Sequence, residues 1–251
     1  MQPRTCLVTG ASRGIGRTIA IRLAAAGHRV AMTARDATAL SAVADELAGP
    51  GLVFPADMTA DGTVEQVVDA VERQWGPVEI LVANAGAGTS APLVETTDHD
   101  WRRMLEVNLT VPFHCLRRTL PAMIAAGWGR VVVVASTAAK IGAPYTAAYT
   151  ASKHGVLGLV RTAAAEVARS GVTVNAVCPG YVDTPMTDAT VAAIVHRTGR
   201  DAAEVRALLA GKQPIGRLIT PDEVATAVLS LIDNPAVTGQ AVNVDGGGVQ
   251  S

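Results

Sequence analysis

Residues 7–20 read LVTGASRGIGRTIA, and this stretch decides the fold class of the chain. A short apolar run ends at Thr9 and leads into a turn with three glycines, Gly10, Gly14 and Gly16, before a segment of helical pattern. Glycines between a strand and a helix let backbone N–H groups approach a pyrophosphate, whose charge the helix N-terminus favours. The spacing Gly-x3-Gly-x-Gly differs from the usual Gly-x-Gly-x-x-Gly, but its position after the first strand indicates a nucleotide site.

Outward from this turn, short β-branched runs alternate with longer segments of helical period. Seven strands are expected, at 6–9, 29–33, 52–54, 79–83, 130–136, 172–177 and 241–244. Helices are expected near 15–26, 37–48, 62–75, 98–126, 148–169 and 221–232. Strands that alternate with helices and are apolar on both faces predict a parallel sheet covered on both sides. We therefore expect an α/β protein with a single Rossmann-type, doubly wound domain over residues 1–251.

Charge and cysteine content narrow the class of protein. The chain has 21 Lys and Arg against 22 Asp and Glu, which argues against nucleic acid as a partner because a phosphate backbone calls for a basic face. Three widely spaced cysteines outline no disulfide framework and favour a reducing compartment. The chain enters a strand pattern at once without a signal peptide, and no apolar run reaches the roughly 20 residues of a membrane span. We expect a cytoplasmic protein that does not enter the membrane. No metal is expected, since the histidines match no ligand spacing: His99, His114, His154 and His196.

The end of the second predicted strand indicates which dinucleotide binds. A site that prefers NAD normally has an acidic residue there to hold the ribose hydroxyls. This chain has Ala34 followed by Arg35, and Arg13 lies inside the glycine turn. Two guanidinium groups that converge on a 2′-phosphate would form a charge-assisted clamp, so NADP(H) is the expected cofactor. The alternative is a pair of solvated surface arginines.

Further motifs follow in a characteristic order along nearly the whole chain. They are TGASRGIG (9–16), AD (56–57), NAG (84–86), Asn108, Ser136, YTASK (149–153), CPGYVDTP (178–185) and VDGG (244–247). Together they resemble the short-chain dehydrogenase/reductase family, in which a serine, a tyrosine and a lysine are catalytic. The resemblance implies that Asn108, Ser136, Tyr149 and Lys153 form the catalytic set.

The chemistry of this set favours ketone reduction. Tyrosine has a pKa of about 10, and a lysine ammonium one helical turn away, at Lys153, is expected to lower the pKa of Tyr149. Tyr149 would give its proton to the ketone oxygen as hydride reaches the carbon, while Ser136 hydrogen-bonds that oxygen. The resemblance implies that Asn108 helps hold a water chain to Lys153, which also grips the nicotinamide ribose. Alternatively, Ser136 is a strand-end cap and Asn108 ties helix backbone together.

The resemblance also implies a set of cofactor contacts. Asp57 would accept from the adenine amino group; the alternative is a turn-forming aspartate. The loop after the sixth strand would lie against the nicotinamide carboxamide. The full set is Gly10, Ser12, Arg13, Gly14, Ile15, Gly16, Arg35, Asp57, Met58, Asn84, Ala85, Gly86, Tyr149, Lys153, Pro179, Gly180, Val182 and Thr184.

The substrate is less defined by sequence. The motifs most resemble β-ketoacyl reductases, polyketide ketoreductases and acyl-CoA-linked dehydrogenases. We therefore expect NADPH-dependent reduction of a β-ketoacyl thioester or of a related apolar or cyclic ketone. The alternatives are a catalytically silent NADP(H)-binding scaffold, or a dehydrogenase of a hydroxyacyl-CoA, a steroid-like alcohol or a sugar alcohol. The chain lacks the Pro-Gly-Gly run of aromatic polyketide ketoreductases, and it has Ala138 and Thr146 where hydroxybutyrate dehydrogenases carry His and Lys.

Three expectations concern partners and mobility. Arg130 and Arg169 lie near positions where carrier-dependent reductases hold acyl carrier protein. By resemblance we expect a homotetramer that pairs the helices at 98–126 and 148–169. Residues 184–216, named the lid segment, are expected to cover the substrate with two short helices near 187–197 and 201–210, with Gly199 as a hinge. The side chains expected to face inward are Val191, Ile194, Val195, Val205, Leu208 and Leu209.

Overall fold

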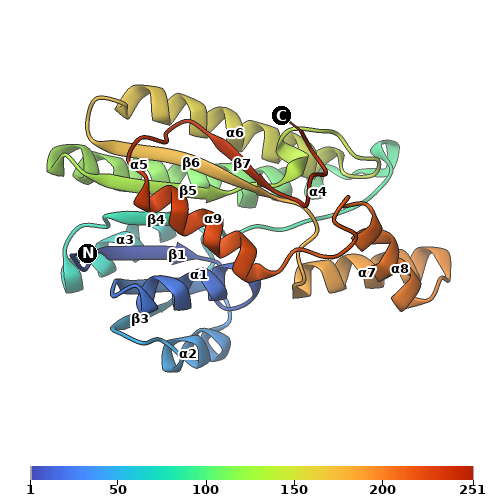
Figure 1. Cartoon of the computed structure of the whole chain (residues 1–251), viewed down its shortest axis with the longest axis horizontal. Coiled ribbons are helices and arrows are strands. Elements are labelled where there is room, and N and C mark those ends of the chain that lie inside the picture. Colours follow the sequence, from blue (N-terminus) through green and yellow to red (C-terminus); the bar gives the residue numbers. More distant parts are fainter. Residues whose placement is uncertain (1, 251) are drawn as a thin grey trace.

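Seven strands form one parallel sheet in the computed structural model, which describes residues 2–250. Their order across the sheet is β3-β2-β1-β4-β5-β6-β7, so the chain runs outward from β1 in one direction and then crosses to β4 (Figure 1). The predicted doubly wound fold is confirmed. The strands are β1 Thr5–Thr9, β2 Arg29–Ala34, β3 Gly51–Pro55, β4 Ile80–Ala83, β5 Gly129–Val134, β6 Val172–Pro179 and β7 Ala241–Val244.

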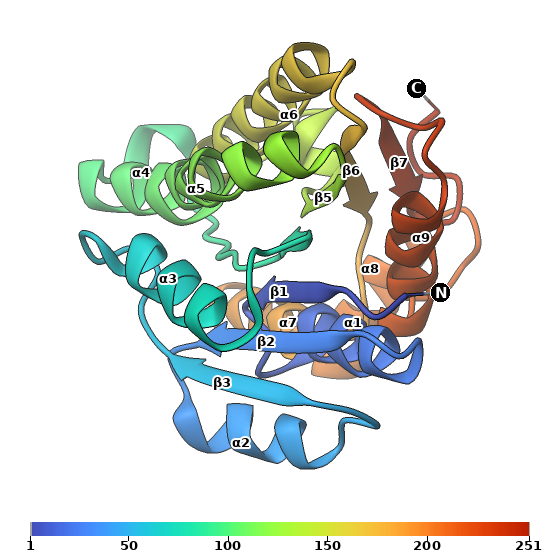
Figure 2. The ribbon, with the colours of Figure 1, turned by 90° about the vertical axis from the view of Figure 1, so that its left-hand side faces the viewer.

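Helices cover both faces of this sheet (Figure 2). One face packs against α1 (Gly14–Ala25), α2 (Ala37–Asp45) and α9 (Pro221–Asp233). The other packs against α3 (Thr63–Trp75), α5 (Val111–Ala126) and α6 (Ala147–Val167). Because successive strand residues point to opposite faces, each central strand supplies both cores.

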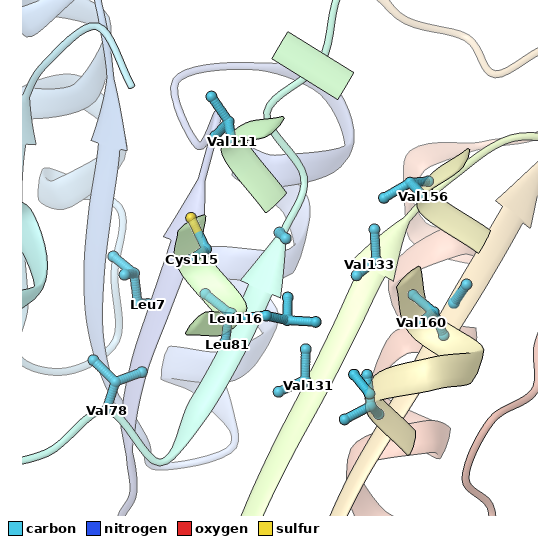
Figure 3. Close-up of a cluster of buried hydrophobic side chains, with 14 of the residues drawn as sticks. Leu7, Val78, Leu81, Val111, Cys115, Leu116, Val131, Val133, Val156 and Val160 are labelled. Carbon is cyan, nitrogen blue, oxygen red and sulfur yellow. The ribbon is translucent and has the colours of Figure 1, made fainter. Parts of the chain in front are cut away.

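The core on the second face shows this alternation directly. Leu7 of β1, Leu81 of β4 and Val131 of β5 point to the same side, toward side chains of α5 and α6 (Figure 3). Their strand neighbours Val8 and Val82 belong to the opposite core. A strand that is buried on both faces has apolar side chains on both. This explains why the strand segments of the sequence do not alternate between apolar and polar residues.

The predicted helix at 98–126 is not continuous. It consists of α4 (Asp98–Leu105), a π-helical turn (Glu106–Thr110) and α5. Asn108 lies in the π turn with 1% of its surface exposed, and its side chain is hydrogen-bonded to the backbone of Ala87. A π turn is a local expansion of the helix that often occurs at functional sites. Here it directs a polar side chain toward the loop after β4.

The lid segment contains α7 (Pro185–Thr198) and α8 (Ala202–Gly211), which project from the rest of the fold at the carboxyl end of the strands (Figure 1). Val191, Val205 and Leu209 form a small core between the two helices, and Ile194 and Val195 pack against it. The expectation for Leu208 is wrong: its side chain is 51% exposed. Leu208 precedes Leu209 by one residue, about 100° around the helix, which turns its side chain away from the shared core.

The expected carrier contact at Arg130 is also wrong. Arg130 is buried on β5, at the end of the sheet opposite the glycine turn, and donates to the carbonyls of Ile232, Gly129 and Gly171. Its guanidinium stacks over Trp128, with Arg4 on the same ring. Burial, and then the charge of Arg4, lower the pKa of Arg130. A partner protein cannot reach this side chain, whereas Arg169 is exposed.

Among residues 2–250, no helix is both long enough and apolar enough to cross a membrane.

Candidate active site

The loops after β1 and β4 are tied together where the chain switches direction in the sheet. The hydroxyl of Thr9 accepts from the backbone N–H groups of Asn84 and Ala85, at 3.0 and 2.9 Å. The Asn84 amide donates to the carbonyls of Thr9 and Gly10 in return. Open parallel sheets bind ligands at this switch point, beyond the carboxyl ends of the strands. These bonds hold that opening in shape.

The glycine turn fits this place because its backbone is crowded. Gly10 has φ +66°, and a Cβ there would lie 2.8 Å from Cα of Ala85. A Cβ on Gly16 would lie 2.3 Å from the carbonyl oxygen of Gly10. Any side chain at either position would push the turn away from the loop after β4. The helix that follows, α1, begins at Gly14 with its N-terminus facing the opening, which suits a bound pyrophosphate.

A cavity of about 890 Å³ opens beside this turn. Its size and its residues fit a dinucleotide, since binding cavities of this kind hold about 300–1,000 Å³. The predicted cofactor contacts that line it are Gly10, Ser12, Arg13, Gly14, Ile15, Arg35, Asp57, Met58, Asn84, Ala85, Gly86 and Thr184. Those that do not line it are Gly16, Tyr149, Lys153, Pro179, Gly180 and Val182.

One end of the cavity carries Arg13, Arg35 and Asp57. Both arginines are exposed and border the cavity from different loops. Asp57 accepts from the backbone and hydroxyl of Thr59, which makes it a turn-forming aspartate while it also lines the cavity. These bonds, and then the charge of Arg35, lower the pKa of Asp57. The two alternatives for Asp57 are therefore compatible.

Sequence reasoning missed a second wall of the cavity. His99, Arg102 and Arg103 of α4 line it, together with Glu106 and Val107 of the π turn. Arg102 is paired with Asp98 on the same helix. No local motif marks these residues, and only the packing of α4 beside the loop after β4 brings them to the cavity.

The candidate proton donor, Tyr149, lies close enough to Ser136 for the Ser136 hydroxyl to affect its pKa. Tyr149 lies in the first turn of α6, and Ser136 follows the end of β5. Burial raises the pKa of Tyr149, the hydrogen bond with Ser136 lowers it, and the net shift is upward. The expected lowering of this pKa by Lys153 is wrong: burial is the largest cause of the shift, and Lys153 is not among the groups that lower it. Tyr149 is therefore protonated at neutral pH, the form that can give a proton to a ketone.

Ser136 also closes a local turn, since its hydroxyl accepts from the backbone N–H of Ala138 at 3.1 Å. The capping role and the contact with Tyr149 occur together. The Ser136 Oγ uses a lone pair to accept from Ala138 N–H. Its own hydroxyl proton therefore remains available to an oxygen that binds beside Tyr149. A hydroxyl proton donated there would stabilise a developing alkoxide.

Lys153 is buried beneath Tyr149. Its Nζ donates to the carbonyl of Val134 at 3.1 Å and lies 5.8 Å from the centre of the Tyr149 ring. Burial lowers the pKa of Lys153 to about 8, opposed by the charge of Cys178. The cavity approaches this lysine at Gly86, where a Cβ would lie 3.7 Å from Nζ. The dinucleotide cavity and the catalytic set thus meet at the loop after β4.

The loop after β6 connects this site to the lid segment. Only Thr184 of the four predicted contacts reaches the cavity, while Pro179, the last residue of β6, and Val182, in the loop, are buried. The buried amide of Gln213 accepts from Tyr181 N–H and donates to its carbonyl, and a Cβ on Gly180 would collide with it. Gln213 had no local sequence signal. It fastens the end of the lid segment to the loop that carries Thr184.

A doubly wound sheet, a dinucleotide cavity at its switch point and an adjoining Ser–Tyr–Lys set define an oxidoreductase that uses a nicotinamide cofactor. The chain belongs to the short-chain dehydrogenase/reductase family, whose model, described as short chain dehydrogenase, matches residues 4–194.

Known relatives cover nearly the whole chain. A putative ketoacyl reductase of Streptomyces coelicolor is 42% identical over 96% of this chain and 95% of its own length. A D-beta-hydroxybutyrate dehydrogenase of Rhizobium meliloti is 38% identical over 97% of this chain and 98% of its own. A crystal structure of a variant actinorhodin polyketide ketoreductase with NADPH has a TM-score of 0.93 at 39% identity, covering 98% of this chain and 97% of that one.

Proposed function

We propose that this protein is an NADPH-dependent reductase that converts a ketone to a secondary alcohol, and the reverse under oxidising conditions. The observation that carries the proposal is the placement of Ser136, Tyr149 and Lys153 together, with Lys153 bordering Gly86 at the wall of a dinucleotide cavity. NADPH supplies the hydride when bound. Tyr149 donates the proton to the carbonyl oxygen, and Ser136 stabilises the charge that builds there. The Lys153 ammonium provides a positive charge next to the Tyr149 ring, which stabilises the phenolate that forms.

The preference for NADPH rests on Arg13 and Arg35. Both line the cavity, and their residue type suits bidentate pairing with a phosphate. The aspartate that follows, Asp36, is used as the N-cap of α2, where it accepts from Ala39 N–H. It is therefore engaged with the helix rather than with a ribose.

We propose a β-ketoacyl thioester, or a related apolar or cyclic ketone, as the substrate class. Apolar side chains border the carboxyl end of the strands: Leu93 after β4 is 73% exposed, and Ile141 and Met186 are half exposed. Leu93 and Ile141 belong to the segments after β4 and β5, and Met186 lies in the first turn of α7, which follows β6. Such a border favours an acyl chain or a carbocycle over a sugar, whose hydroxyls would lose hydrogen bonds to water.

A panel of substrates tests the function. NADPH consumption is measured with β-ketoacyl thioesters of coenzyme A and of acyl carrier protein, with cyclic ketones and with sugars, each against NADH. We expect turnover of the first three groups with NADPH and little with sugars. Binding of NADPH without consumption by any ketone would instead favour the silent scaffold.

The lid segment is proposed to close over the substrate as one rigid body. Arg206 of α8 forms ion pairs with Asp183 and Asp188, and α7 and α8 share a core of their own. Gly199 has φ +68° and ends α7, so it serves as a helix cap between two joined helices. The hinge expected at Gly199 is therefore better assigned to the two ends of the lid segment. Arg197 of α7 contacts the rest of the fold, through a hydrogen bond to Ser90 and a contact with the ring of Tyr145.

Limited proteolysis tests this closure. Arg197 and Arg200 are exposed beside Gly199, so trypsin should cut there quickly in the protein alone. Cleavage should slow with NADP(H) and substrate bound, because a closed lid segment opens less often. The double variant Arg197→Gln/Arg200→Gln is the control that identifies the site. Equal cleavage rates in both states would contradict a mobile lid segment.

We propose a homotetramer in the cytoplasm. Trp101 of α4 and Phe113 and Ile124 of α5 are exposed apolar side chains on helices expected to pair across a two-fold axis, and Val242 is exposed on the edge strand β7. The three cysteines are unpaired and buried, as suits a reducing compartment. Light scattering that gives a monomer at every concentration would contradict the assembly.

A further inference from the structure

Ser152, inside the YTASK motif, links the catalytic helix to the π turn. Its side chain is fully buried. Its hydroxyl donates to the carbonyl of Tyr149 at 2.7 Å, and Nδ2 of Asn108 donates to its oxygen at 3.2 Å. One hydroxyl therefore joins the backbone of the candidate proton donor to the amide of Asn108.

The direction of each bond follows from the chemistry of the groups. A backbone carbonyl can only accept, so the single proton of Ser152 is committed to Tyr149. The Ser152 oxygen then faces Asn108 as an acceptor, and Asn108 must present its NH2 group. The bonds of Asn108 with Ala87, from Ala87 N–H to Oδ1 and from Nδ2 to the carbonyl, require the same orientation. Without Ser152, the second amide proton is left with only the sulfur of Met104, at 3.8 Å.

This orientation places the Asn108 oxygen beside Gly86, which also borders Lys153. A Cβ on Gly86 would lie 3.1 Å from Oδ1 of Asn108 and 3.7 Å from Nζ of Lys153, so both atoms border one point. The partial negative charge of Oδ1, which also accepts from Ala87 N–H, thus lies in the neighbourhood of the ammonium, and a negative charge there favours the charged form of Lys153. The other groups that face Lys153 are Tyr149 on its own helix, the Val134 carbonyl on β5 and Cys178 on β6.

We propose that Ser152 is a positioning residue, which holds the amide of Asn108 so that its oxygen favours the ammonium form of Lys153. Its effect on reduction rests on the proposed function, but its effect on Lys153 does not. The chain has three lysines, Lys140, Lys153 and Lys212, and of these only Lys153 belongs to the catalytic set. Their signals can therefore be assigned with Lys140→Arg and Lys212→Arg.

The test is the titration of Lys153, followed by NMR of protein labelled with ¹³C-lysine. The unmodified protein should titrate with a pKa of about 8, since burial lowers it. Ser152→Ala should titrate at lower pH, because Asn108 loses a contact that orients its oxygen. Ser152→Cys, whose sulfur is a weaker acceptor, should fall between the two.

Thr119→Val is the matched control. The Thr119 hydroxyl is buried in α5 and donates to the Cys115 carbonyl, as Ser152 does to Tyr149, but forms no bond with the site. Thr119→Val should leave the titration of Lys153 unchanged. An identical titration in Ser152→Ala and the unmodified protein would overturn the proposal, as would an equal shift in the control.

Turnover supplies the second measurement. In Ser152→Ala the alkaline fall of kcat should begin at lower pH, with a several-fold loss near the Lys153 midpoint and an unchanged KM for the ketone. A shift in the NMR titration of a protein that reduces no ketone would leave the positioning role intact and contradict the proposed function. A loss of kcat that is the same at every pH would overturn the link through Lys153.

Discussion

Replacing Tyr149 with phenylalanine should abolish ketone reduction while NADPH still binds. Phenylalanine keeps the ring between Ser136 and Lys153 but has no proton to give. General acid–base groups contribute typically 10²–10⁴-fold to rate, so we expect a loss of about 10³-fold in kcat. Because Tyr149 does not line the dinucleotide cavity, the dissociation constant of NADPH should change little. Single-turnover measurements and cofactor fluorescence separate the two effects.

Lys153→Ala is the informative comparison for Tyr149→Phe. Lys153 approaches the cavity at Gly86, and its Nζ lies 5.8 Å from the centre of the Tyr149 ring, so its loss should weaken both turnover and cofactor binding. Circular dichroism establishes that each variant is folded. If Tyr149→Phe retained most of the rate, another group would have to deliver the proton and the mechanism would be wrong.

Removing Arg13 and Arg35 together should abolish the preference for NADPH over NADH. A charge-assisted contact contributes roughly 1.5–3 kcal/mol, and exposure of both side chains favours the lower end of that range. We therefore expect about ten-fold weaker NADPH binding for each arginine and about 100-fold for the pair. NADH, which lacks the 2′-phosphate, should bind the variant and the unmodified protein alike. Calorimetry with both cofactors measures this directly.

Two controls sharpen the cofactor experiment. Arg22→Ala removes an exposed arginine of α1 that pairs with Asp222, away from the cavity, and should leave NADPH binding unchanged. The preference for NADPH should also decline with added salt, as exposed charge pairs do. Equal affinity of the unmodified protein for NADPH and NADH would exclude the arginine clamp.

Most of the fold could be predicted from local sequence patterns. Short β-branched runs and Ala-rich helical segments marked every strand and helix of the sheet to within a few residues, because their periods follow from the backbone itself. The π turn escaped prediction. Asn108 interrupts an otherwise regular helical pattern, and its departure depends on a hydrogen bond to Ala87, 21 residues earlier in the chain.

Charge and exposure were harder to predict than position. Arg130 looked like a docking residue, but the sheet buries it against backbone carbonyls and Trp128. Leu208 looked like part of the lid core, yet the crossing of α7 and α8 leaves it outside. Both errors have one cause: a sequence pattern identifies a type of side chain, whereas its surroundings come from elements distant in the chain.

The sequence by itself determined the parallel sheet, the glycine turn and the order of the Ser, Tyr and Lys motifs, because each depends on residues close together in the chain. Only the tertiary structure decided the α4 wall of the cavity, the bond from Asn108 to Ser152 and the direction in which the pKa of Tyr149 shifts. The first two require segments that meet through packing. The last follows from burial, which raises the pKa of Tyr149 more than its hydrogen bond with Ser136 lowers it.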